Sequence, residues 1–282
     1  MRLATILEAG RPSVAVVREA RLLPLVMPDA GLGSMREIAA SGSDGLRRIA
    51  AWVERQPKGA YRPLGEAVLG PAVHDPGAIF TIGLNFVAPG ESATAGQERP
   101  LVYGKLPTAV TGTGSTVTWD RALTAQVDPE AELGVVIGTR AESVEPGDAM
   151  RHVFGYTCMN DISSRDPWLD GDQWLLGKSM AGFCPVGPWI VTADELDPGN
   201  LRLGCTINAI AIQDGTTADM RFSVAEIVSY LSRHTVLRPG DLIATGTPAR
   251  RSGPMGPDRH LQAGDVVAVW IERIGELTTT IT

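Results

Sequence analysis

The first seventy residues show an apolar and polar pattern typical of two short strands followed by two helices. The strands are predicted over residues 3–7 and 13–17, and the helices over residues 34–40 and 44–54. Asp44 is predicted to cap the second helix, because a short polar side chain there can accept a free backbone N–H. The polar segment 56–63 contains two prolines and is predicted to be a linker. The pattern therefore predicts a small N-terminal α/β domain over residues 1–70, and nothing in it suggests chemistry.

The remaining residues, 71–282, consist mostly of short apolar runs between turns. Strands are predicted over residues 78–85, 127–138, 153–159, 201–207, 242–245, 266–271 and 277–281. Two helices are predicted over residues 146–153 and 224–231, and Ser223 with Glu226 forms a capping box for the second. The chain has 32 glycines and 20 prolines, which suits many turns. This second domain is predicted to be α+β and mostly β.

Composition limits the class of protein. The chain has 282 residues, of which 44% are hydrophobic and 20% charged, enough for one large core plus a small unit. It lacks an apolar run long enough for a membrane span, and the acid Glu8 comes too early for a signal peptide, so we expect a cytoplasmic protein. The net charge of −7 argues against nucleic acid as a partner. Cys158, Cys184 and Cys205 are odd in number and lie among apolar residues, which predicts core cysteines rather than disulfides.

Three carboxylates are the first sign of chemistry. Glu130 and Glu132 lie two residues apart at the start of a predicted strand, so their side chains point to one face. Asp161 follows another predicted strand. Like charges held close together favour a bound cation, and three oxygen ligands suit Mg²⁺ or Mn²⁺. The alternative is a solvated acidic face without a metal.

The surrounding motifs resemble those of the fumarylacetoacetate hydrolase family. They are, in order, residues 128–138, Gly155-Tyr156, Asn160-Asp161, Arg165-Asp166, Gly177-Lys178-Ser179, Pro185-Val186-Gly187-Pro188, Pro239-Gly240-Asp241 and Thr245-Gly246-Thr247-Pro248. The resemblance covers roughly residues 75–282. It implies a layered mixed β-roll, a homodimer, and Mg²⁺ or Mn²⁺ on Glu130, Glu132 and Asp161.

The resemblance also implies roles for polar residues around the acids. Lys178 is expected to stabilise developing negative charge, and its apolar surroundings independently predict a buried lysine with an acidic partner. Arg165 is expected near the substrate carboxylate, with an ion pair to Asp166 as the alternative. Lys105 is expected to line the site, with plain surface exposure as the alternative.

Two further residues are expected to contact the substrate. The resemblance implies that Gln213 reaches the substrate and that Thr247 grips its pyruvate-like end. The pair Gly246-Thr247 at a strand end is expected to expose a backbone N–H and a hydroxyl that together hold a carboxylate. An exposed turn glutamine without a function is the alternative for Gln213.

The chain departs from the family at one position. The family has a histidine followed three residues later by a glutamate, but Pro89 stands in the place of the histidine. Glu91 or Glu98 is expected to serve as a substitute base, and a loop without a catalytic role is the alternative. The histidines of the chain offer no evident replacement.

These observations predict an enzyme acting on a small oxo acid. The first hypothesis is a metal-dependent hydrolase of a C–C bond in a β-diketo acid resembling an acylpyruvate. The alternative reaction is decarboxylation, dehydration or isomerisation, and decarboxylation or isomerisation needs no activated water. A retired enzyme that still binds an oxo acid, and a structural β-rich dimer without metal, are hypotheses from other classes.

Overall fold

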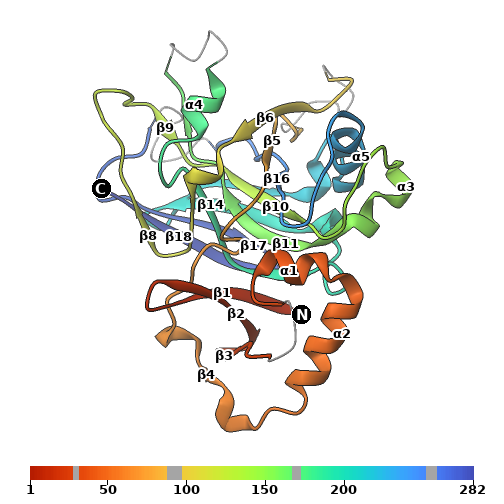
Figure 1. Cartoon of the computed structure of the whole chain (residues 1–282). Helices are drawn as coiled ribbons and strands as arrows, with labels where there is room; N and C mark the ends of the chain where they lie inside the picture. The colour runs from red at the N-terminus through yellow and green to blue at the C-terminus, as the bar shows by residue number, and fades with distance from the viewer. Residues whose placement is uncertain (28–31, 88–96, 167–172, 252–258) are drawn as a thin grey trace.

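The computed structural model describes residues 1–27, 32–87, 97–166, 173–251 and 259–282. Its largest sheet has eleven strands, ten of them in the order β4-β3-β2-β1-β13-β11-β10-β16-β5-β6, with β7 paired to β13 (Figure 1). The strands are β1 (Arg2–Glu8), β2 (Arg11–Arg18), β3 (Arg21–Pro24), β4 (Arg62–Pro63), β5 (Ile79–Gly83), β6 (Leu101–Lys105), β7 (Val110–Thr111), β10 (Ala131–Ile137), β11 (Val153–Asn160), β13 (Cys184–Thr192) and β16 (Leu242–Ala244).

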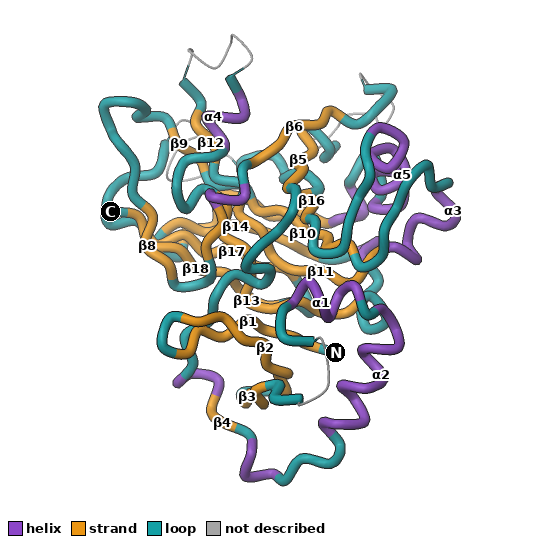
Figure 2. The backbone as a smooth tube through the Cα atoms, in the orientation of Figure 1, coloured by secondary structure: helices purple, strands orange, loops and turns teal. Residues whose placement is uncertain are grey.

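A second sheet packs against the first and closes the main core (Figure 2). Its order is β15-β14-β17-β18-β8, and a separate pair is formed by β12 and β9. The strands are β8 (Ser115–Val117), β9 (Val127–Asp128), β12 (Ser163–Ser164), β14 (Arg202–Ile207), β15 (Ile210–Thr216), β17 (Val266–Ile271) and β18 (Gly275–Ile281). Leu133 and Val135 of β10 pack with Val267 and Val269 of β17 in this core. The predicted layered, mostly β fold is confirmed.

The central strands are buried on both faces, which explains their continuous apolar runs. Val135 of β10 faces the core between the sheets, whereas its neighbour Val136 packs in a second cluster with Met35 and Ile49 of the N-terminal helices. Glu132 lies four residues before Val136 and Glu130 lies six before it. Because side-chain direction alternates along a strand, both glutamate side chains point to that second face. The two glutamates therefore lie on the side of β10 that faces away from the core between the two sheets.

The helices are short. They are α1 (Met35–Ala40), α2 (Gly42–Val53), α3 (Pro146–Ala149), α4 (Trp174–Lys178) and α5 (Val224–His234). The capping box of Ser223 and Glu226 is confirmed. The prediction that Asp44 caps α2 is wrong, because Gly42 (φ 57°) turns the chain directly from α1 into α2 and leaves Asp44 inside the first turn. The predicted helix 146–153 is α-helical only to Ala149 and continues as a 3₁₀ turn.

The N-terminal unit shares the large sheet with the rest of the chain. Arg2 of β1 pairs with Val191 of β13. Within the predicted linker, Arg62 of β4 pairs with Leu22 of β3, so this segment forms one edge of the sheet. The division at residue 70 stays a prediction, and the hydrogen-bonded sheet runs across it.

Two expectations from composition can be compared with the structure. The three cysteines are free and buried, as predicted. Desolvation raises the pKa of the Cys184 thiol to about 12 and also raises those of Cys158 and Cys205, so all three are protonated at neutral pH. Among the described residues, no helix is both long enough and apolar enough to cross a membrane.

The β14–β15 hairpin gives a stability prediction. Its turn residues Asn208 and Ala209 have φ of 51° and 64°, and Ala209 is exposed. A left-handed conformation costs a residue with a Cβ about 1–2 kcal/mol. Glycine avoids this cost, but part of the gain in stability is lost because its unfolded state has more conformational freedom. We expect Ala209→Gly to raise the free energy of unfolding by about 0.5–1 kcal/mol in urea denaturation. The reverse change at a comparable exposed turn, Gly264→Ala (φ 91°), should destabilise, and a loss of stability in Ala209→Gly would contradict the account.

Candidate functional site

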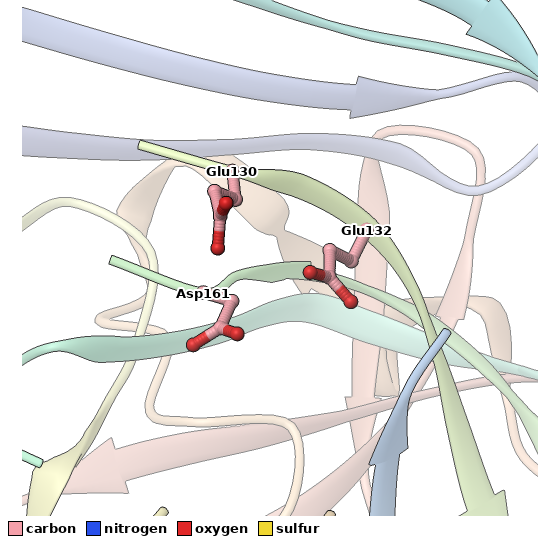
Figure 3. Close-up of side chains that lie close together, drawn as sticks. All are labelled: Glu130, Glu132 and Asp161. Atoms are coloured by element: carbon pink, nitrogen blue, oxygen red, sulfur yellow. The ribbon is translucent and has the colours of Figure 1, made fainter. Parts of the chain in front are cut away.

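Three carboxylates from two neighbouring strands form the centre of the site. Glu132 lies on β10, Glu130 lies directly before this strand, and Asp161 directly follows β11. The strands are antiparallel with Glu132 opposite Met159, and the Asp161 N–H donates to the Glu130 carbonyl at 3.0 Å. One oxygen of each carboxylate lies within 4.8 Å of the others (Figure 3). The predicted meeting of the three acids is confirmed.

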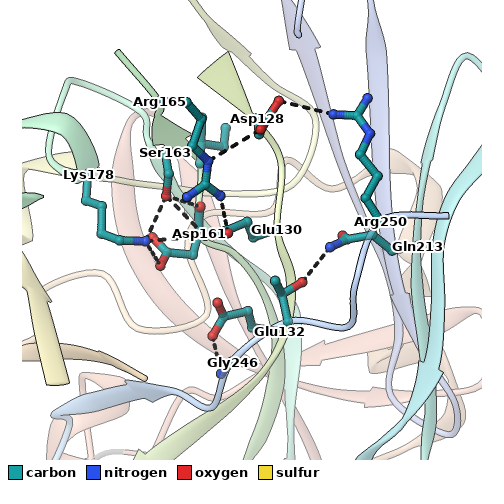
Figure 4. Close-up of polar contacts among 12 residues, drawn as sticks. Asp128, Glu130, Glu132, Asp161, Ser163, Arg165, Lys178, Gln213, Gly246 and Arg250 are labelled. Carbon is teal, nitrogen blue, oxygen red and sulfur yellow. Dashed lines mark hydrogen bonds and ion pairs between the residues drawn. The ribbon is translucent and has the colours of Figure 1, made fainter. Parts of the chain in front are cut away.

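Two buried lysines form ion pairs with Asp161, one with each carboxylate oxygen. Lys178, the last residue of α4, donates from Nζ to Oδ2 at 2.5 Å and to Ser163 Oγ at 2.8 Å (Figure 4). Lys105, at the end of β6, donates to Oδ1 at 2.5 Å and to the Ile162 carbonyl at 3.0 Å. The side chains of Lys105 and Lys178 are 0% and 6% exposed. The predicted burial of Lys178 is confirmed, and the alternative of a surface Lys105 is wrong.

Arg165 connects the three acids to a fourth carboxylate, that of Asp128. Its Nη2 donates to Glu130 Oε1 and its Nε lies 3.4 Å from Asp128 Oδ2. The alternative ion pair with Asp166 is wrong, because Asp166 accepts hydrogen bonds from the hydroxyls of Thr124 and Ser164 instead. The side chain of Arg165 is therefore directed toward the three acids.

Burial and charge act in opposite directions on these groups. Desolvation raises the pKa of Glu132 well above its usual value, and Asp161 and Glu130 raise it further. Desolvation acts to raise the pKa of Asp161 as well, but Lys105 and Lys178 lower it to about 2. Burial acts to lower the pKa of Lys178, and Asp161, Glu130 and Glu132 more than reverse this. Among the acids, Glu132 is the one whose negative charge is poorly compensated.

The donor set fits a hard divalent cation. Its members are all carboxylates, and Mg²⁺ and Mn²⁺ prefer oxygen ligands. The lysines occupy one position on each oxygen of Asp161, but a carboxylate has about four lone-pair positions, so acceptor capacity remains for a metal ion. Glu132 is 2% exposed and receives the Gly246 N–H at 2.6 Å. A cation among the three acids would supply the positive charge that Glu132 lacks.

The raised pKa of Glu132 makes metal binding pH-dependent. When folding raises the pKa of a carboxyl, ionising that group costs more in the folded protein than in the unfolded chain. The folded state therefore loses stability as the pH increases from the unfolded pKa, about 4.3 for glutamate, to the folded pKa. A metal ion offsets this cost but must first displace the proton. We therefore expect saturating Mn²⁺ to raise the melting temperature more at about pH 8 than at about pH 5.5, measured by differential scanning fluorimetry. Glu132→Gln should remove the difference, and equal shifts at both pH values in the unmodified protein would contradict this reasoning.

The expected free N–H at Gly246 is already used within the protein. The Gly246 N–H holds Glu132, and the Thr247 hydroxyl donates to the Ala131 carbonyl at 2.8 Å. The prediction that this pair is free to hold a substrate carboxylate is therefore wrong for the N–H. Gly246 has φ of 99°, and a Cβ there would lie 2.7 Å from the Cβ of Asn85, so the tight approach requires glycine.

Gln213 is buried in β15, so the alternative of an exposed turn glutamine is wrong. Its Nε2 donates to Thr247 Oγ1 at 2.7 Å and to the Pro248 carbonyl at 2.9 Å, and its Oε1 accepts the Ala131 N–H at 2.9 Å. These bonds fix the strand that carries Glu130 and Glu132. Contact of Gln213 and Thr247 with a substrate stays a prediction.

Two adjoining hollows open on the acids. The smaller, about 220 Å³, is lined by the three carboxylates and Lys178, and the wider one is about 680 Å³. They share Leu84, Glu130, Arg165 and Thr247. A small oxo acid would fit the smaller hollow, and the wider one offers space for the remainder of a substrate.

The substitute base is not located by the described residues. Glu91 and Pro89 lie outside them. Glu98 is exposed and lines neither hollow. Among the described lining residues of the two hollows, none is a histidine, although His260 Nδ1 lies 2.9 Å from Asp128 Oδ1 just behind the wider one.

Sequence reasoning missed the residues that complete the wider hollow. Arg250 lies 3.2 Å from Asp128, a residue 122 positions earlier in the chain, and Arg221 and Leu84 line the same hollow. The left-handed conformation of Leu84 (φ 53°) also has no sequence signal. Such contacts between distant segments leave no local pattern to detect.

Comparison with known proteins assigns the family. A model of the C-terminal domain of fumarylacetoacetate (FAA) hydrolase matches residues 78–282. The chain belongs to the fumarylacetoacetate hydrolase family. The fold of the whole chain resembles that of a family member from Exiguobacterium antarcticum, with a TM-score of 0.86, 31% identity, and coverage of 100% of this chain and 99% of the other.

Two further family structures carry reaction names. Maleylpyruvate hydrolase from Sphingobium sp. SYK-6, in complex with manganese(II) and pyruvate, is 26% identical with a TM-score of 0.80, and covers 100% and 99% of the two chains. A 2-hydroxyhepta-2,4-diene-1,7-dioate isomerase from Mycobacterium marinum is 28% identical with a TM-score of 0.76. The match covers 100% of this chain and 98% of the other. The family relatives thus include both hydrolases and isomerases.

Proposed function

We propose that the protein is a divalent-metal-dependent hydrolase that cleaves a C–C bond of an acylpyruvate-like β-diketo acid. The observation that carries the proposal is Lys178, buried with its ammonium against Asp161 and Glu130 on the wall of the smaller hollow. The likeness to a maleylpyruvate hydrolase with manganese(II) and pyruvate supports it. When bound at Glu130, Glu132 and Asp161, a divalent cation would polarise the carboxylate and 2-oxo oxygens of the substrate.

In this reaction water adds to the 4-oxo carbon, and the bond between C3 and C4 breaks. The electron pair passes to C3 and the 2-oxo oxygen as a pyruvate enolate, which takes a proton at C3 to give pyruvate, while the acyl group leaves as a carboxylate. Lys178 stabilises the negative charge that develops on the 2-oxo oxygen. We assign the 1-carboxylate to Arg165, which lines both hollows and carries a planar fork suited to a carboxylate. Glu91 is proposed as the base that activates water.

A decarboxylase or isomerase acting on a 2-oxo acid is the second candidate. It needs the same enolate stabilisation but no positioned water. The absence of histidine among the described lining residues, and the likeness to an isomerase, favour this alternative. A retired protein that only binds oxo acids would keep the acids and Lys178 without turnover.

An NMR time course in D₂O with Mg²⁺ or Mn²⁺ tests these reactions. Acetylpyruvate and oxaloacetate are followed in parallel, with EDTA and Glu132→Gln as negative controls. Glu276→Gln makes the same chemical change at an exposed position of β18 and should leave turnover unchanged. Acetate plus pyruvate from acetylpyruvate is the expected result.

The other outcomes reject the hydrolase. Pyruvate from oxaloacetate alone, or only deuterium entry at C3, would assign a decarboxylase or isomerase. Oxalate binding to the Mn²⁺-loaded protein without any turnover would favour the retired enzyme.

A further inference from the structure

The segment that follows β16 lies along the strand that carries Glu132. The Thr245 N–H donates to the Leu133 carbonyl at 3.1 Å, and the Gly246 N–H donates to Glu132 Oε2 at 2.6 Å. The Thr247 hydroxyl donates to the carbonyl of the residue before Glu132 at 2.8 Å. Three consecutive residues of this segment therefore contact three consecutive residues of β10. The middle contact is the one that reaches a side chain of the three acids (Figure 4).

A single peptide group connects Glu132 to a buried amide on its other side. The Thr245 carbonyl and the Gly246 N–H belong to the same peptide. The N–H donates to Glu132, and the carbonyl accepts a hydrogen bond from Asn85 Nδ2 at 2.7 Å. A peptide is planar, and its C=O and N–H point in opposite directions, so a bond at one end fixes the direction of the other. Asn85 therefore sets the direction of the Gly246 N–H.

Asn85 is itself firmly held and does not reach a ligand. It is fully buried, its second N–H donates to the Phe222 carbonyl at 3.1 Å, and its Oδ1 accepts the Phe222 N–H at 2.9 Å. Both N–H donors of its amide are thus in use. It is not among the described residues that line the two hollows. Asn85 can therefore affect a bound cation only through the residues that it holds.

The peptide needs this support because Gly246 permits a second orientation. Its φ of 99° is a conformation that glycine adopts readily and other residues rarely adopt. Reversing the peptide would bring φ into the negative region, which is open to every residue, and would turn the N–H away from Glu132. The Thr245 carbonyl, which belongs to a fully buried residue, would then lose its bond to Asn85. That loss opposes the reversal.

Glu132 depends on this N–H more than the other two acids depend on any one partner. Asp161 is paired with two lysines, and Glu130 is paired with Arg165. Within the described ranges, the Gly246 N–H is the one group that donates to Glu132. By holding one carboxylate oxygen, it fixes the direction of the other. Without it, a cation would meet a ligand whose orientation is no longer set.

We propose that Asn85 is a positioning residue for the metal site: it holds the Thr245 carbonyl, directs the Gly246 N–H at Glu132, and so fixes this carboxylate for a divalent cation. The proposal rests on the part of the proposed function that places a cation among the three acids. It does not depend on which reaction follows. Removing a partner of a metal ligand typically weakens metal binding by about 10- to 100-fold. Asn85 acts through one further group, so we expect about 10-fold.

Asn85→Ala in the full-length protein is the first test. Electron paramagnetic resonance of free Mn²⁺ gives the dissociation constant, which should rise about 10-fold, and circular dichroism checks the fold. Gly246→Ala should have the same effect by an independent route. It keeps the amide of Asn85, but alanine disfavours a φ of 99° and its Cβ would lie 2.7 Å from the Cβ of Asn85. Should Asn85→Ala prove unfolded, Gly246→Ala carries the test by itself.

Ser223→Ala is the matched control for a general loss of stability. Ser223 follows Phe222, to which Asn85 is also bonded, and its hydroxyl caps α5. Removing the cap should lower the urea midpoint in EDTA without altering the peptide that Asn85 holds, so Mn²⁺ affinity should be unchanged. If Ser223→Ala weakened Mn²⁺ binding as much as Asn85→Ala does, the effect would be one of general stability and the positioning role would be overturned.

The positioning role and the hydrolase fail in different ways. Unchanged Mn²⁺ affinity in Asn85→Ala, with turnover of acetylpyruvate by the unmodified protein, would reject the positioning role and keep the hydrolase. Weaker Mn²⁺ binding in Asn85→Ala and Gly246→Ala, without turnover by the unmodified protein, would support the positioning role and reject the hydrolase. A lack of Mn²⁺ binding by the unmodified protein would reject both.

Discussion

Asp161→Asn is expected to lower the free energy of unfolding by about 3–5 kcal/mol in the absence of metal, the usual effect of removing one partner from a buried ion pair. Lys105 and Lys178 each place Nζ 2.5 Å from this carboxylate, and both side chains are almost fully buried. Without the negative charge, the two ammonium groups would face each other across a neutral amide. The measurement is urea denaturation in EDTA near neutral pH.

Glu132→Gln provides the contrast, because it removes a carboxylate from the same group of acids with the opposite expected effect. The pKa of Glu132 is raised by desolvation and by its acidic neighbours, so its ionised form destabilises the folded protein near neutral pH. A glutamine can still accept the Gly246 N–H, and metal-free stability should therefore rise. Both variants should lose the stabilisation by Mn²⁺. If Asp161→Asn proved no less stable than Glu132→Gln, the pairing of the two lysines with Asp161 would be wrong.

Lys178→Met is expected to lower kcat for acetylpyruvate by about 100- to 1000-fold, the usual effect of removing one donor to a developing oxyanion. Methionine is similar in length to lysine but carries no charge, so the enolate would lose its ammonium partner. Affinity for Mn²⁺ should not fall, because the substitution removes a cation beside Asp161 and Glu130. The two quantities are measured by NMR turnover and by electron paramagnetic resonance of free Mn²⁺.

The matched control is Lys58→Met, the same change at an exposed lysine of the N-terminal unit. It should leave turnover and Mn²⁺ binding unchanged. If Lys178→Met bound Mn²⁺ normally and turned over acetylpyruvate within about 10-fold of the unmodified protein, the role of Lys178 in stabilising charge would have to be abandoned.

Elements that depend on neighbouring positions in the chain were predicted well from the sequence. The apolar run at 153–159 became β11, and the capping box at Ser223 begins α5. The strand predicted over 127–138 is divided: residues 131–137 form β10, and 127–128 form the separate strand β9, which pairs with β12. The spacing of two between Glu130 and Glu132 predicted that they share a face, because side-chain direction alternates along a strand. The family motifs then placed Asp161 and Lys178 with them. The expected homodimer stays a prediction.

Local patterns predicted less well where two neighbouring signals compete. Asp44 is a good capping residue, but Gly42 begins the helix earlier. Arg165 and Asp166 are adjacent in sequence and opposite in charge, yet each has partners on other segments. Lys105 beside Leu106 and Pro107 has the sequence of an exposed turn, and its burial depends on Asp161, which lies 56 residues later. These outcomes depend on which segments pack together.

The sequence alone determined the family, the mostly β architecture, the three acids and the buried lysine beside them, because periodicity and motif order are properties of contiguous residues. Only the tertiary structure decided that Gly246 uses its N–H on Glu132, that Lys105 shares Asp161 with Lys178, and that Asp128 holds Arg250 and Arg165. Each of these contacts joins segments far apart in the chain. Their energies come from burial and from opposite charges brought together by the fold, and neither quantity exists before the strands have paired.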